Sequence, residues 1–363
     1  MRELVDRVYE AAFVPEQWNR VLQGACDLSA SASGQVLFFS PNGPPRGITL
    51  DNLRPVFNRF IKGDFWTSCA SVQRICSVRP ASFVRVEDLV PAEEIARDPL
   101  RIMLRKFGIG AHLCTAIPMP TGELAIFVFQ KWTNDGGYEQ DEIDKLNALR
   151  PHLERASLVA GRIGIERAEA TSSTLDLMGW PAAVLSSGGR VMAMNPRLAR
   201  MSATFLPVAF GGLAIADANA NERFQAAMER MNRAGAGGSS IPVPAIGDEP
   251  ALVIHLLPLR RVAHDIFGGA ETLILATPIA ASQLAPSATL LNVLFDMTPA
   301  EARLATDLTG GLTLAESAAK HGVTVKSSRT YLERIFRKTG IHRQGQLVAM
   351  LKTVQPHASP PSG

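Results

Sequence analysis

Cationic and hydrogen-bonding residues recur at helical spacing near the end of the sequence, within VKSSRTYLERIFRKTG. One side of a helical wheel drawn through this segment carries Lys326, Arg329, Thr330, Glu333 and Arg337. The major groove of DNA admits a helix that presents such groups to base edges and phosphates. The pattern therefore indicates nucleic-acid recognition, and the alternative is an ordinary solvated helix face.

Helix-capping signals surround this segment. Thr298 with Glu301, and Thr313 with Glu316, each have the spacing of a capping box at a helix start. Gly322 is expected to end the second of these helices in the left-handed conformation, and a new cap follows only two residues later. So short a connection predicts a sharp helix-turn-helix.

The run from Thr298 to Leu351 resembles the C-terminal domain of LuxR-type transcription regulators, through TPAEARLA, GLTLAESAAKHGVTVKSSRTYLERIFRKTG and RQGQLVAML. The resemblance implies an all-α four-helix DNA-binding domain over residues 288–353, whose last helix often pairs two subunits. By position it implies that Arg329 and Thr330 face bases, while phosphates are held by Thr324, Lys326, Arg337 and Lys338. The full set of expected DNA-binding residues is Thr324, Lys326, Ser327, Arg329, Thr330, Glu333, Arg337 and Lys338.

Four residues depart from the pattern of that family. Ser317, His321 and Ser328 stand where apolar residues usually pack the helices together, which predicts a domain that is less stable alone. Glu333 places a carboxylate on the expected DNA-facing side. It either reads a cytosine amino group or weakens the attraction to phosphates.

Positive charge is concentrated in the same region. Residues 290–353 hold nine Lys and Arg against five Asp and Glu, a net +4, whereas the whole chain carries 37 against 34, a net +3. The remaining residues therefore carry 28 against 29, a net −1. A basic module on a near-neutral body is typical of a regulator whose affinity for double-stranded DNA resides at one end.

The cysteine pattern and the apolar runs argue against several other classes of protein. The four cysteines are widely spaced without a CxxC pair, which predicts neither a zinc site nor a disulfide framework. No apolar run approaches the ~20 residues that span a bilayer, and the N-terminus lacks the apolar stretch of a signal peptide. We therefore expect a cytoplasmic protein with no membrane partner.

No catalytic motif is evident. The chain lacks a Gly-rich phosphate loop, a GxSxG elbow and an HExxH pair, so we expect neither enzyme activity nor a cofactor or metal. It also lacks the arrangement of acidic residues of a response regulator. The tryptophan, tyrosine and Asp-Pro pattern of acyl-homoserine-lactone receptors is absent around Trp66, so quorum sensing does not follow from the resemblance.

Residues 1–168 are expected to form a first α/β domain. The pattern predicts two helices within residues 2–28 that are separated at Pro15, then a strand QVLFFS, a turn at PNGPP and a helix over 51–61. A short strand near 83–86, a helix interrupted at Pro99, a hairpin of HLCTAIPM and ELAIFVFQK, and a long helix from Tyr138 follow.

This order of elements is similar to that of GAF sensor domains, through GIGAHLCTAIPM, GELAIFVFQ and YEQDEIDKLNALRPHLERA. Such domains form a sheet under helices, and many hold a small ligand. The residues expected to line a ligand site here are Phe39, Trp66, Phe83, His112 and Cys114. The alternative is that these residues are ordinary core.

A heptad-like seam runs along the predicted long helix. Its members step by three and four residues and are Leu146, Leu149, Leu153, Ala156, Ala160 and Ile163. The seam fits either a dimerising signal helix or a helix packed on its own sheet. A polar hinge, ERAEATSST, is expected to close the first domain.

Residues 172–282 are expected to form a second α/β domain that resembles PAS domains. The pattern gives a hairpin of AAVLS and RVMAMN, an Asn195-capped helix, the helix ANERFQAAMERMNRA and three strands in IPVPA, ALVIHLLPLR and ETLILATPI. His255 is interpreted as structural and not as a haem ligand. The proline-rich residues 354–363 are expected to be a disordered tail.

These expectations describe a multidomain α+β protein with GAF-like, PAS-like and LuxR-type helix-turn-helix parts. The leading hypothesis is a dimeric, sequence-specific DNA-binding transcription regulator whose sensor-like N-terminal domains modulate DNA binding, with a small-molecule ligand as a further partner. The alternative is a protein-interaction regulator with a degenerate helix-turn-helix that titrates another regulator. A ligand-regulated enzyme would need catalytic residues that are not evident.

Overall fold

A computed structural model of the chain describes residues 1–40, 43–63, 65–234, 237–259, 267, 269–279 and 288–353. It contains helices and antiparallel sheets, which confirms the predicted α+β class. The chain divides into two compact units, the first comprising Met1–Asp176, Pro181–Ile241 and Ile254–Ala276, and the second Leu177–Trp180, Pro242–Val253 and Thr277–Gly363. The predicted boundaries of three domains remain a prediction, and the predicted tail lies outside the described residues.

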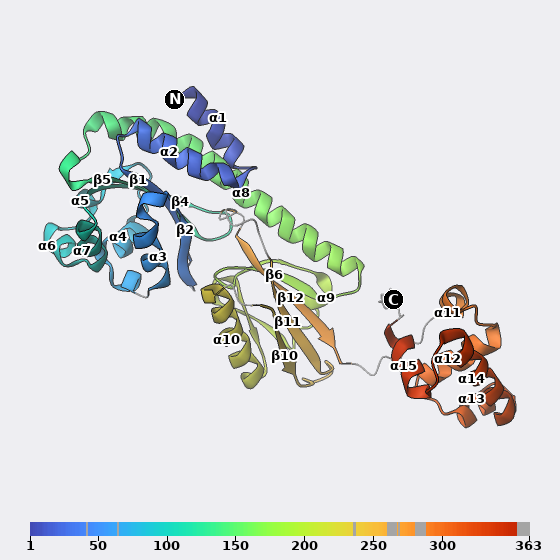
Figure 1. Cartoon of the computed structure of the whole chain (residues 1–363). Helices are drawn as coiled ribbons and strands as arrows, with labels where there is room; N and C mark the ends of the chain where they lie inside the picture. Colours follow the sequence, from blue (N-terminus) through green and yellow to red (C-terminus); the bar gives the residue numbers. More distant parts are fainter. Residues whose placement is uncertain are drawn as a thin grey trace. The chain divides into compact units, whose positions relative to one another are not determined.

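The first sheet has the strand order β2-β1-β5-β4-β3 (Figure 1). Its strands are β1 (Ser33–Ser40), β2 (Gly43–Thr49), β3 (Val84–Arg85), β4 (Ile109–Pro118) and β5 (Leu124–Trp132). The pairs between β1 and β2, β1 and β5, β3 and β4, and β4 and β5 are antiparallel. The predicted β4–β5 hairpin is confirmed, and Gly122 at its turn has a positive φ of 85°, which suits glycine.

Strand β2 is a difference from the sequence-based expectation, which placed only a turn at PNGPP. Residues from Gly43 onward pair with β1, for example Ile48 with Val36 and Arg46 with Phe38. Proline cannot donate a ladder hydrogen bond, but β2 lies at the edge of the sheet, where one side of a strand needs no partner. The prolines therefore mark an edge strand.

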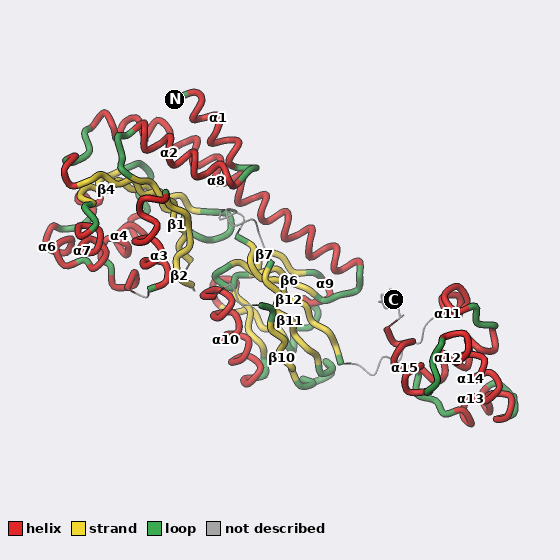
Figure 2. The backbone as a smooth tube through the Cα atoms, viewed as in Figure 1, coloured by secondary structure: helices red, strands yellow, loops and turns green. Residues whose placement is uncertain are grey.

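Helices cover both faces of this sheet (Figure 2). One face packs against α1 (Arg2–Ala11), α2 (Trp18–Leu28) and α8 (Gln140–Leu177), and the other against α3 (Arg54–Lys62), α4 (Ala70–Val78), α5 (Val86–Leu89), α6 (Ala92–Arg97) and α7 (Pro99–Lys106). Alternate residues of β5 serve the two cores, with Phe127 and Phe129 on the α8 side and Ile126 and Val128 on the other. A strand buried on both faces is largely apolar, as β5 is from Leu124 to Phe129.

The heptad-like seam of α8 packs on its own sheet. Leu146, Leu149 and Leu153 belong to the core on this side of the sheet, and each is at most 1% exposed. Pro151 lies inside the helix without ending it. The structure thus favours the interpretation that the seam packs on the sheet of its own domain. A dimerising role of the helix stays a prediction.

The predicted polar hinge at ERAEATSST is wrong, because α8 continues through it to Leu177. The hydroxyls of Thr171 and Thr174 donate to the carbonyls of Arg167 and Ala170, each over 2.8 Å. Side chains that bond to the preceding turn satisfy their own hydroxyls without leaving the helix. Polar composition alone therefore did not indicate a break.

The second sheet has the order β10-β11-β12-β6-β7. Its strands are β6 (Ala182–Ser186), β7 (Val191–Met194), β10 (Ser239–Val243), β11 (Leu252–Pro258) and β12 (Ala270–Pro278), and its helices are α9 (Pro196–Ala199) and α10 (Ala218–Ala234). Asn195 caps α9, since its side chain accepts from Leu198 N over 3.0 Å. These elements were predicted, whereas the hairpin of β8 (Phe205–Val208) and β9 (Gly212–Ile215) was not.

Phe267, from the segment between β11 and β12, contributes to the core of the first sheet. Its ring stacks on that of Trp18 with centroids 4.1 Å apart and meets the ring of Phe38 edge-on at 4.9 Å. Phe267 is 1% exposed. A residue far along the chain thus closes the aromatic part of this core.

Five helices make up the described C-terminal part: α11 (Ala288–Phe295), α12 (Pro299–Thr309), α13 (Leu314–Lys320), α14 (Val325–Thr339) and α15 (Gln344–Thr353). Both predicted capping boxes are present, at Thr298 and at Thr313. Gly322, between α13 and α14, has a positive φ of 65°, as expected of the residue that turns the chain. The core of these helices contains Leu304, Leu308, Leu332, Ile335 and Leu347.

Candidate nucleic-acid interface and buried cavity

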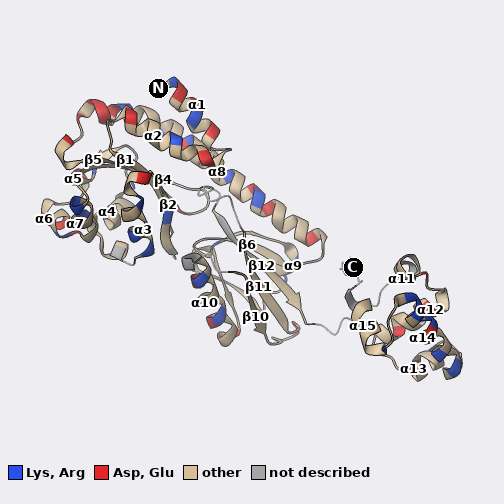
Figure 3. Cartoon of the chain, in the orientation of Figure 1, with Lys and Arg blue, Asp and Glu red and all other residues tan. Residues whose placement is uncertain are grey.

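Helix α14 has a buried side and an exposed, mainly basic side. Leu332 and Ile335 are buried in the core of the C-terminal helices. The exposed residues on the other side are Lys326, Arg329, Thr330, Glu333 and Arg337. Figure 3 shows Lys and Arg positions on this helix. Within the described part of the chain, Arg329 and Arg337 form no side-chain hydrogen bond or ion pair, so both guanidinium groups face solvent.

Thr324 and Ser327 form the start of α14. The Thr324 hydroxyl accepts from Ser327 N over 3.1 Å and lies 2.9 Å from the Ser327 hydroxyl. Thr330 donates to the Lys326 carbonyl over 3.2 Å. The N-terminal turn of a helix presents backbone N–H groups that can bind a phosphate. In α14 this turn also carries Lys326, which belongs to the exposed basic face.

Lys338 differs from the role that the sequence suggested for it. Its ammonium group donates to Glu301 Oε2 over 2.8 Å and to the Asp296 carbonyl over 2.6 Å. The Glu301 side chain is only 1% exposed, so this ion pair joins the end of α14 to the start of α12. The geometry gives Lys338 a structural contact in place of the expected phosphate contact.

The pKa of Glu301 reflects this contact. Burial raises the pKa of the carboxyl group, but the hydrogen bonds from Lys338 and Thr298 outweigh burial and leave the pKa below its ordinary value. Glu301 also completes the capping box by accepting from Thr298 N over 2.8 Å. One carboxylate thus serves both the helix cap and the ion pair.

The polar residues at packing positions surround a second buried carboxylate, that of Asp307. Ser317 Oγ donates to Asp307 Oδ2 over 2.6 Å, His321 Nε2 lies 2.7 Å from the same oxygen, and Lys320 Nζ lies 2.7 Å from Oδ1. The Asp307 side chain is 4% exposed. Buried polar groups that are hydrogen-bonded do not carry the cost of unpaired ones. Ser317 and His321 therefore hold α12 and α13 together through Asp307.

The charge of Asp307 is stabilised by these partners. Burial raises its pKa, but the hydrogen bonds from Lys320, Ser317 and His321 together lower it below the ordinary value. The carboxylate form is thus the one that the folded helices favour at neutral pH. Ser328, the remaining departure from the family pattern, is buried on α14.

A cavity lies between the first sheet and helices α3–α7. Its volume is about 60 Å³. On the same scale, one water molecule needs ~10–15 Å³. Most of its lining is aliphatic or aromatic, from Leu37, Phe39, Phe57, Phe60, Val72, Ile126 and Val128 among others. The polar groups on its wall include Arg101, His112 and Gln130.

These three polar residues come from adjacent parts of the fold. His112 on β4 and Gln130 on β5 are direct cross-strand partners, and such pairs have Cβ atoms about 4.5–5.5 Å apart. Arg101 projects from α7 and is 4% exposed, as is His112, whereas Gln130 is 1% exposed. Arg101 also forms an ion pair with Glu87.

Asp98 positions the helix that carries Arg101. Its Oδ1 accepts from Leu100 N over 2.9 Å and caps α7, while its Oδ2 accepts from Ser71 N over 2.8 Å and Ser71 Oγ over 2.6 Å. A single buried carboxylate thereby ties the start of α7 to α4. This tie fixes where the Arg101 side chain emerges.

Burial and nearby positive charges lower the pKa values of His112 and Arg101. Burial and then the charge of Arg101 hold the pKa of His112 well below its ordinary value, with a smaller contribution from Arg105, while the Gly110 carbonyl acts in the opposite direction. The imidazole is therefore neutral. Burial also lowers the pKa of Arg101, more than the carboxylate of Glu87 raises it.

The structure brings two of the five expected ligand residues to this cavity, Phe39 and His112. Trp66 packs against Phe39 with ring centroids 6.3 Å apart, and Cys114 belongs to the adjoining core cluster. Phe83 lies on the opposite side of the sheet against Phe129, with centroids 5.6 Å apart, and so away from the cavity.

Arg101 and Gln130 were missed from the sequence. The signal for Gln130 was a polar residue that ends the apolar strand ELAIFVFQ and shares alternation with Ile126 and Val128. Arg101 carried the weaker signal of a charge between apolar neighbours on a short helix. Neither signal indicates by itself which residues of other elements lie beside Gln130 or Arg101.

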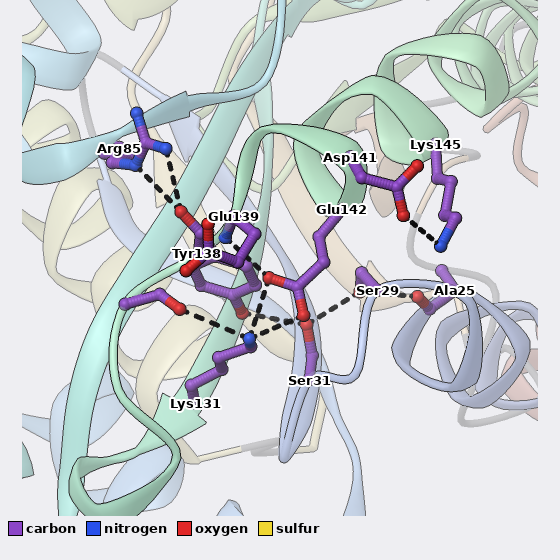
Figure 4. Close-up of polar contacts among 11 residues, drawn as sticks. Ala25, Ser29, Ser31, Arg85, Lys131, Tyr138, Glu139, Asp141, Glu142 and Lys145 are labelled. Carbon is purple, nitrogen blue, oxygen red and sulfur yellow. Dashed lines mark hydrogen bonds and ion pairs between the residues drawn. The ribbon is translucent and has the colours of Figure 1, made fainter.

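A separate polar network fixes the start of α8 (Figure 4). Lys131 Nζ donates to Glu142 Oε1 over 2.6 Å and lies 4.9 Å from the centre of the Tyr138 ring. The Tyr138 hydroxyl lies 2.8 Å from Ser31 Oγ, and Arg85 donates to the Tyr138 carbonyl over 2.8 Å. Because its central polar groups are paired with one another, this network is a structural one.

The remaining chemistry of the described residues is modest. The cysteines are free thiols, and burial raises the pKa of Cys26, Cys69 and Cys114 to about 12 and that of Cys76 to about 11. They therefore stay protonated at neutral pH. Within the described ranges, no three His, Cys, Asp or Glu residues gather as metal ligands, and no helix has the length and apolarity needed to cross a membrane.

No protein-family model matches the sequence, and no curated protein matches it. Weak similarity to solved structures is present. The VqsR ligand-binding domain from Pseudomonas aeruginosa is 14% identical, covering 44% of this chain and 94% of that one, with a TM-score of 0.37. The phage VqmA–DPO complex is 16% identical, covering 53% and 92%, with a TM-score of 0.22. The Vibrio cholera VqmA–ligand–DNA complex is 14% identical, covering 52% and 89%, with a TM-score of 0.24. These scores are too low to assign a fold or a function.

Proposed function

We propose that the chain is a sequence-specific DNA-binding transcription regulator of the LuxR type, with α13 and α14 as its helix-turn-helix. The observation that carries the proposal is the exposed face of α14, on which Lys326, Arg329 and Arg337 are free of ion pairs with other described residues. A helix with cationic and hydroxyl groups on one side fits the major groove. The capped, tight connection before α14 holds that face outward.

The base-facing residues in this proposal are Arg329 and Thr330. The phosphate contacts come from Lys326, Arg337 and the capped N-terminus of α14 at Thr324. Arginine suits a guanine edge because its two donors match two acceptors. Lys338 is left out, because its ammonium already pairs with Glu301.

The input in this proposal is a GAF-like domain around the first sheet, with a PAS-like domain around the second. The cavity beside His112 supplies the ligand site. A ligand shifts the population of a protein between two arrangements only by binding them with different affinity. We infer that such a shift decides whether a homodimer presents two α14 helices at half-site spacing. The proposal assigns a cytoplasmic location and no catalytic role.

The test is genome-wide footprinting followed by gel-shift titration of the full-length chain on the recovered site. Arg329→Ala is expected to cost about 1–3 kcal/mol of binding free energy and to relax specificity at one base pair. Arg223→Ala is the matched control, since it removes an exposed arginine from α10 with the same change of charge. Unchanged binding by Arg329→Ala would remove that residue from the interface.

The alternative, a protein-interaction regulator with a degenerate helix-turn-helix, is favoured by the exposed carboxylate of Glu333 on the same face. It predicts that footprinting recovers no reproducible site. It also predicts that the purified chain releases another regulator from DNA in a gel shift.

A further inference from the structure

Four buried polar atoms on the cavity wall lack a partner with hydrogen-bond geometry among the described residues: Arg101 Nη1, both ring nitrogens of His112, and Gln130 Oε1. The Gly110 carbonyl influences the pKa of His112 without meeting that geometry. Buried polar groups in folded proteins are nearly always paired, and leaving one unpaired costs free energy. All three residues line the same cavity. Their grouping indicates a partner that the cavity receives from outside the chain.

The unpaired atoms define a pattern of donors and acceptors. Arg101 Nη1 can only donate, and Gln130 Oε1 can only accept. The neutral imidazole of His112 offers one N–H donor and one acceptor nitrogen. A matching ligand therefore carries a strong acceptor for two donors, with a hydroxyl or amide N–H close to it.

The charges near His112 favour a negatively charged acceptor on the ligand. The charged groups near His112 are Arg101 and Arg105 on α7, Asp98 at the start of α7 and Glu87 on α5. Both arginines act on His112 as positive charges. Asp98 and Glu87 equal the two arginines in number, so the four formal charges sum to zero, but the charges that act on His112 itself are those of Arg101 and Arg105. The surroundings of the His112 ring are thus positive, while the wall as a whole is balanced.

The size and lining of the cavity limit the rest of the ligand. A volume of about 60 Å³ corresponds to roughly four to six water-sized positions. Most of the surrounding side chains, among them Leu37, Phe57, Phe60, Val72 and Val128, offer no hydrogen bonds. A short hydrocarbon chain or small ring fits there, since apolar lining favours apolar atoms.

We propose that this cavity binds a small apolar monocarboxylic acid, with its carboxylate against Arg101 Nη1 and the His112 N–H, and a neighbouring hydroxyl or amide N–H donating to Gln130 Oε1. The proposal rests on the proposed function only in giving the acid the role of signal. Arginine and carboxylate form charge-assisted hydrogen bonds, which are stronger than neutral ones in a buried site. The carboxylate also favours protonation of the imidazole beside it.

The test uses the full-length chain and two probes of matched size, butanoate and its uncharged amide, butanamide, in isothermal titration calorimetry. Butanoate is expected to bind at least about tenfold more tightly, the equivalent of one charge-assisted hydrogen bond. 3-Hydroxybutanoate is expected to bind more tightly than butanoate, because its hydroxyl reaches Gln130. Equal or tighter binding of butanamide would overturn the proposal.

Proton uptake provides a second readout. Titrations at neutral pH in two buffers with different ionisation enthalpies are expected to show that butanoate binding takes up a proton, because the carboxylate raises the pKa of His112. In His112→Phe this uptake is expected to disappear. Uptake of the same size in that variant would remove His112 from the site.

Variants on α7 separate the contact from the general charge. Arg101→Met is expected to lower butanoate affinity at least about tenfold while leaving the weak butanamide affinity unchanged. Arg105→Met makes the same change of charge at an exposed residue of the same helix and is expected to have a smaller effect. Far-UV circular dichroism shows whether each variant is folded. If Arg101→Met does not fold, Arg101→Lys, which keeps the charge, replaces it and is expected to retain a preference for butanoate.

The experiments can reject the proposed ligand class and the proposed function independently of each other. Probe binding is measured without DNA, so butanoate binding by a chain that has no DNA site supports the ligand class and rejects the regulator. A chain that binds its DNA site but neither butanoate nor 3-hydroxybutanoate overturns the ligand class alone.

Discussion

Ser317 Oγ donates a hydrogen bond of 2.6 Å to Asp307 Oδ2, which joins α13 to a buried carboxylate of α12. The bond explains why a serine can occupy a buried position between α12 and α13. Lys320, which shares that carboxylate, is 56% exposed, so its contribution is screened by solvent. The buried hydroxyl is therefore the more important of the two contacts for stability.

Ser317→Ala is expected to destabilise the C-terminal helices by about 1–3 kcal/mol, the cost of leaving part of a buried charged group without a partner. Urea denaturation of the full-length chain, followed by circular dichroism, measures this change. Ser327→Ala at the start of α14 is a comparison that removes a half-buried hydroxyl whose partner, Thr324, is exposed and uncharged, and it should cost less. A loss no larger than that of Ser327→Ala would contradict the role of the Asp307 contact.

Acid is expected to destabilise the same helices. The folded-state pKa values of Asp307 and Glu301 lie below their ordinary values, so their contribution is present above the unfolded pKa and is lost as pH falls through the folded pKa. With unfolded values of about 4, the loss begins near pH ~5 and grows below it. Thermal melts at a series of pH values measure it. Asp307→Asn should flatten this dependence.

The sequence predicted elements whose signals are local. Thr298, Thr313 and Gly322 act through hydrogen bonds and backbone angles within a few residues, and the structure has them as expected. The break at Pro15 is equally local, because proline removes a donor and blocks the preceding turn. The hinge expected after residue 165 was wrong because a polar segment at the surface of a helix has the same composition as a loop.

The candidate sites depended on contacts that have no local signature. The sequence alone predicts that Lys338 contacts a phosphate. In the structure, Glu301 of α12 lies 2.8 Å from its ammonium group. Gln130 becomes a cavity residue only because β4 pairs His112 opposite it and α7 brings Arg101 to the same wall. Such pairings join residues from three elements, and one sequence does not specify which elements meet.

Lys338 and Arg337 are adjacent residues for which the structure predicts opposite phenotypes. Lys338→Met removes the partner of a carboxylate that is 1% exposed, and we expect it to cost about 1–3 kcal/mol of stability while the salt dependence of DNA binding stays the same. Arg337→Met removes an exposed cation, and we expect it to leave stability unchanged. It should reduce the slope of log affinity against log salt by about 1. Denaturation and salt-dependent gel shifts distinguish the two, and reversed phenotypes would contradict the assignment.

Phe267 is expected to stabilise the core around the first sheet. Phe267→Ala removes a ring that stacks on Trp18 at 4.1 Å and leaves a cavity, with an expected cost of about 3–5 kcal/mol. The unfolding midpoint in urea, followed by tryptophan fluorescence, measures the change. Phe210→Ala is the control, since Phe210 is 70% exposed and its loss should change stability by no more than about 0.5 kcal/mol.

Glu333 is one helical turn from both Arg329 and Arg337 on the exposed face of α14, and it has no ion pair with another described residue. A carboxylate at that distance lowers the positive potential that draws a helix to phosphates. We therefore expect Glu333→Gln to strengthen binding to specific and non-specific DNA by a similar factor of a few. Gel shifts on the recovered site and on a scrambled duplex measure both affinities. If Glu333 instead accepts from a cytosine amino group, the variant would weaken binding to the specific site alone, because the base would lose its acceptor while the phosphates kept theirs.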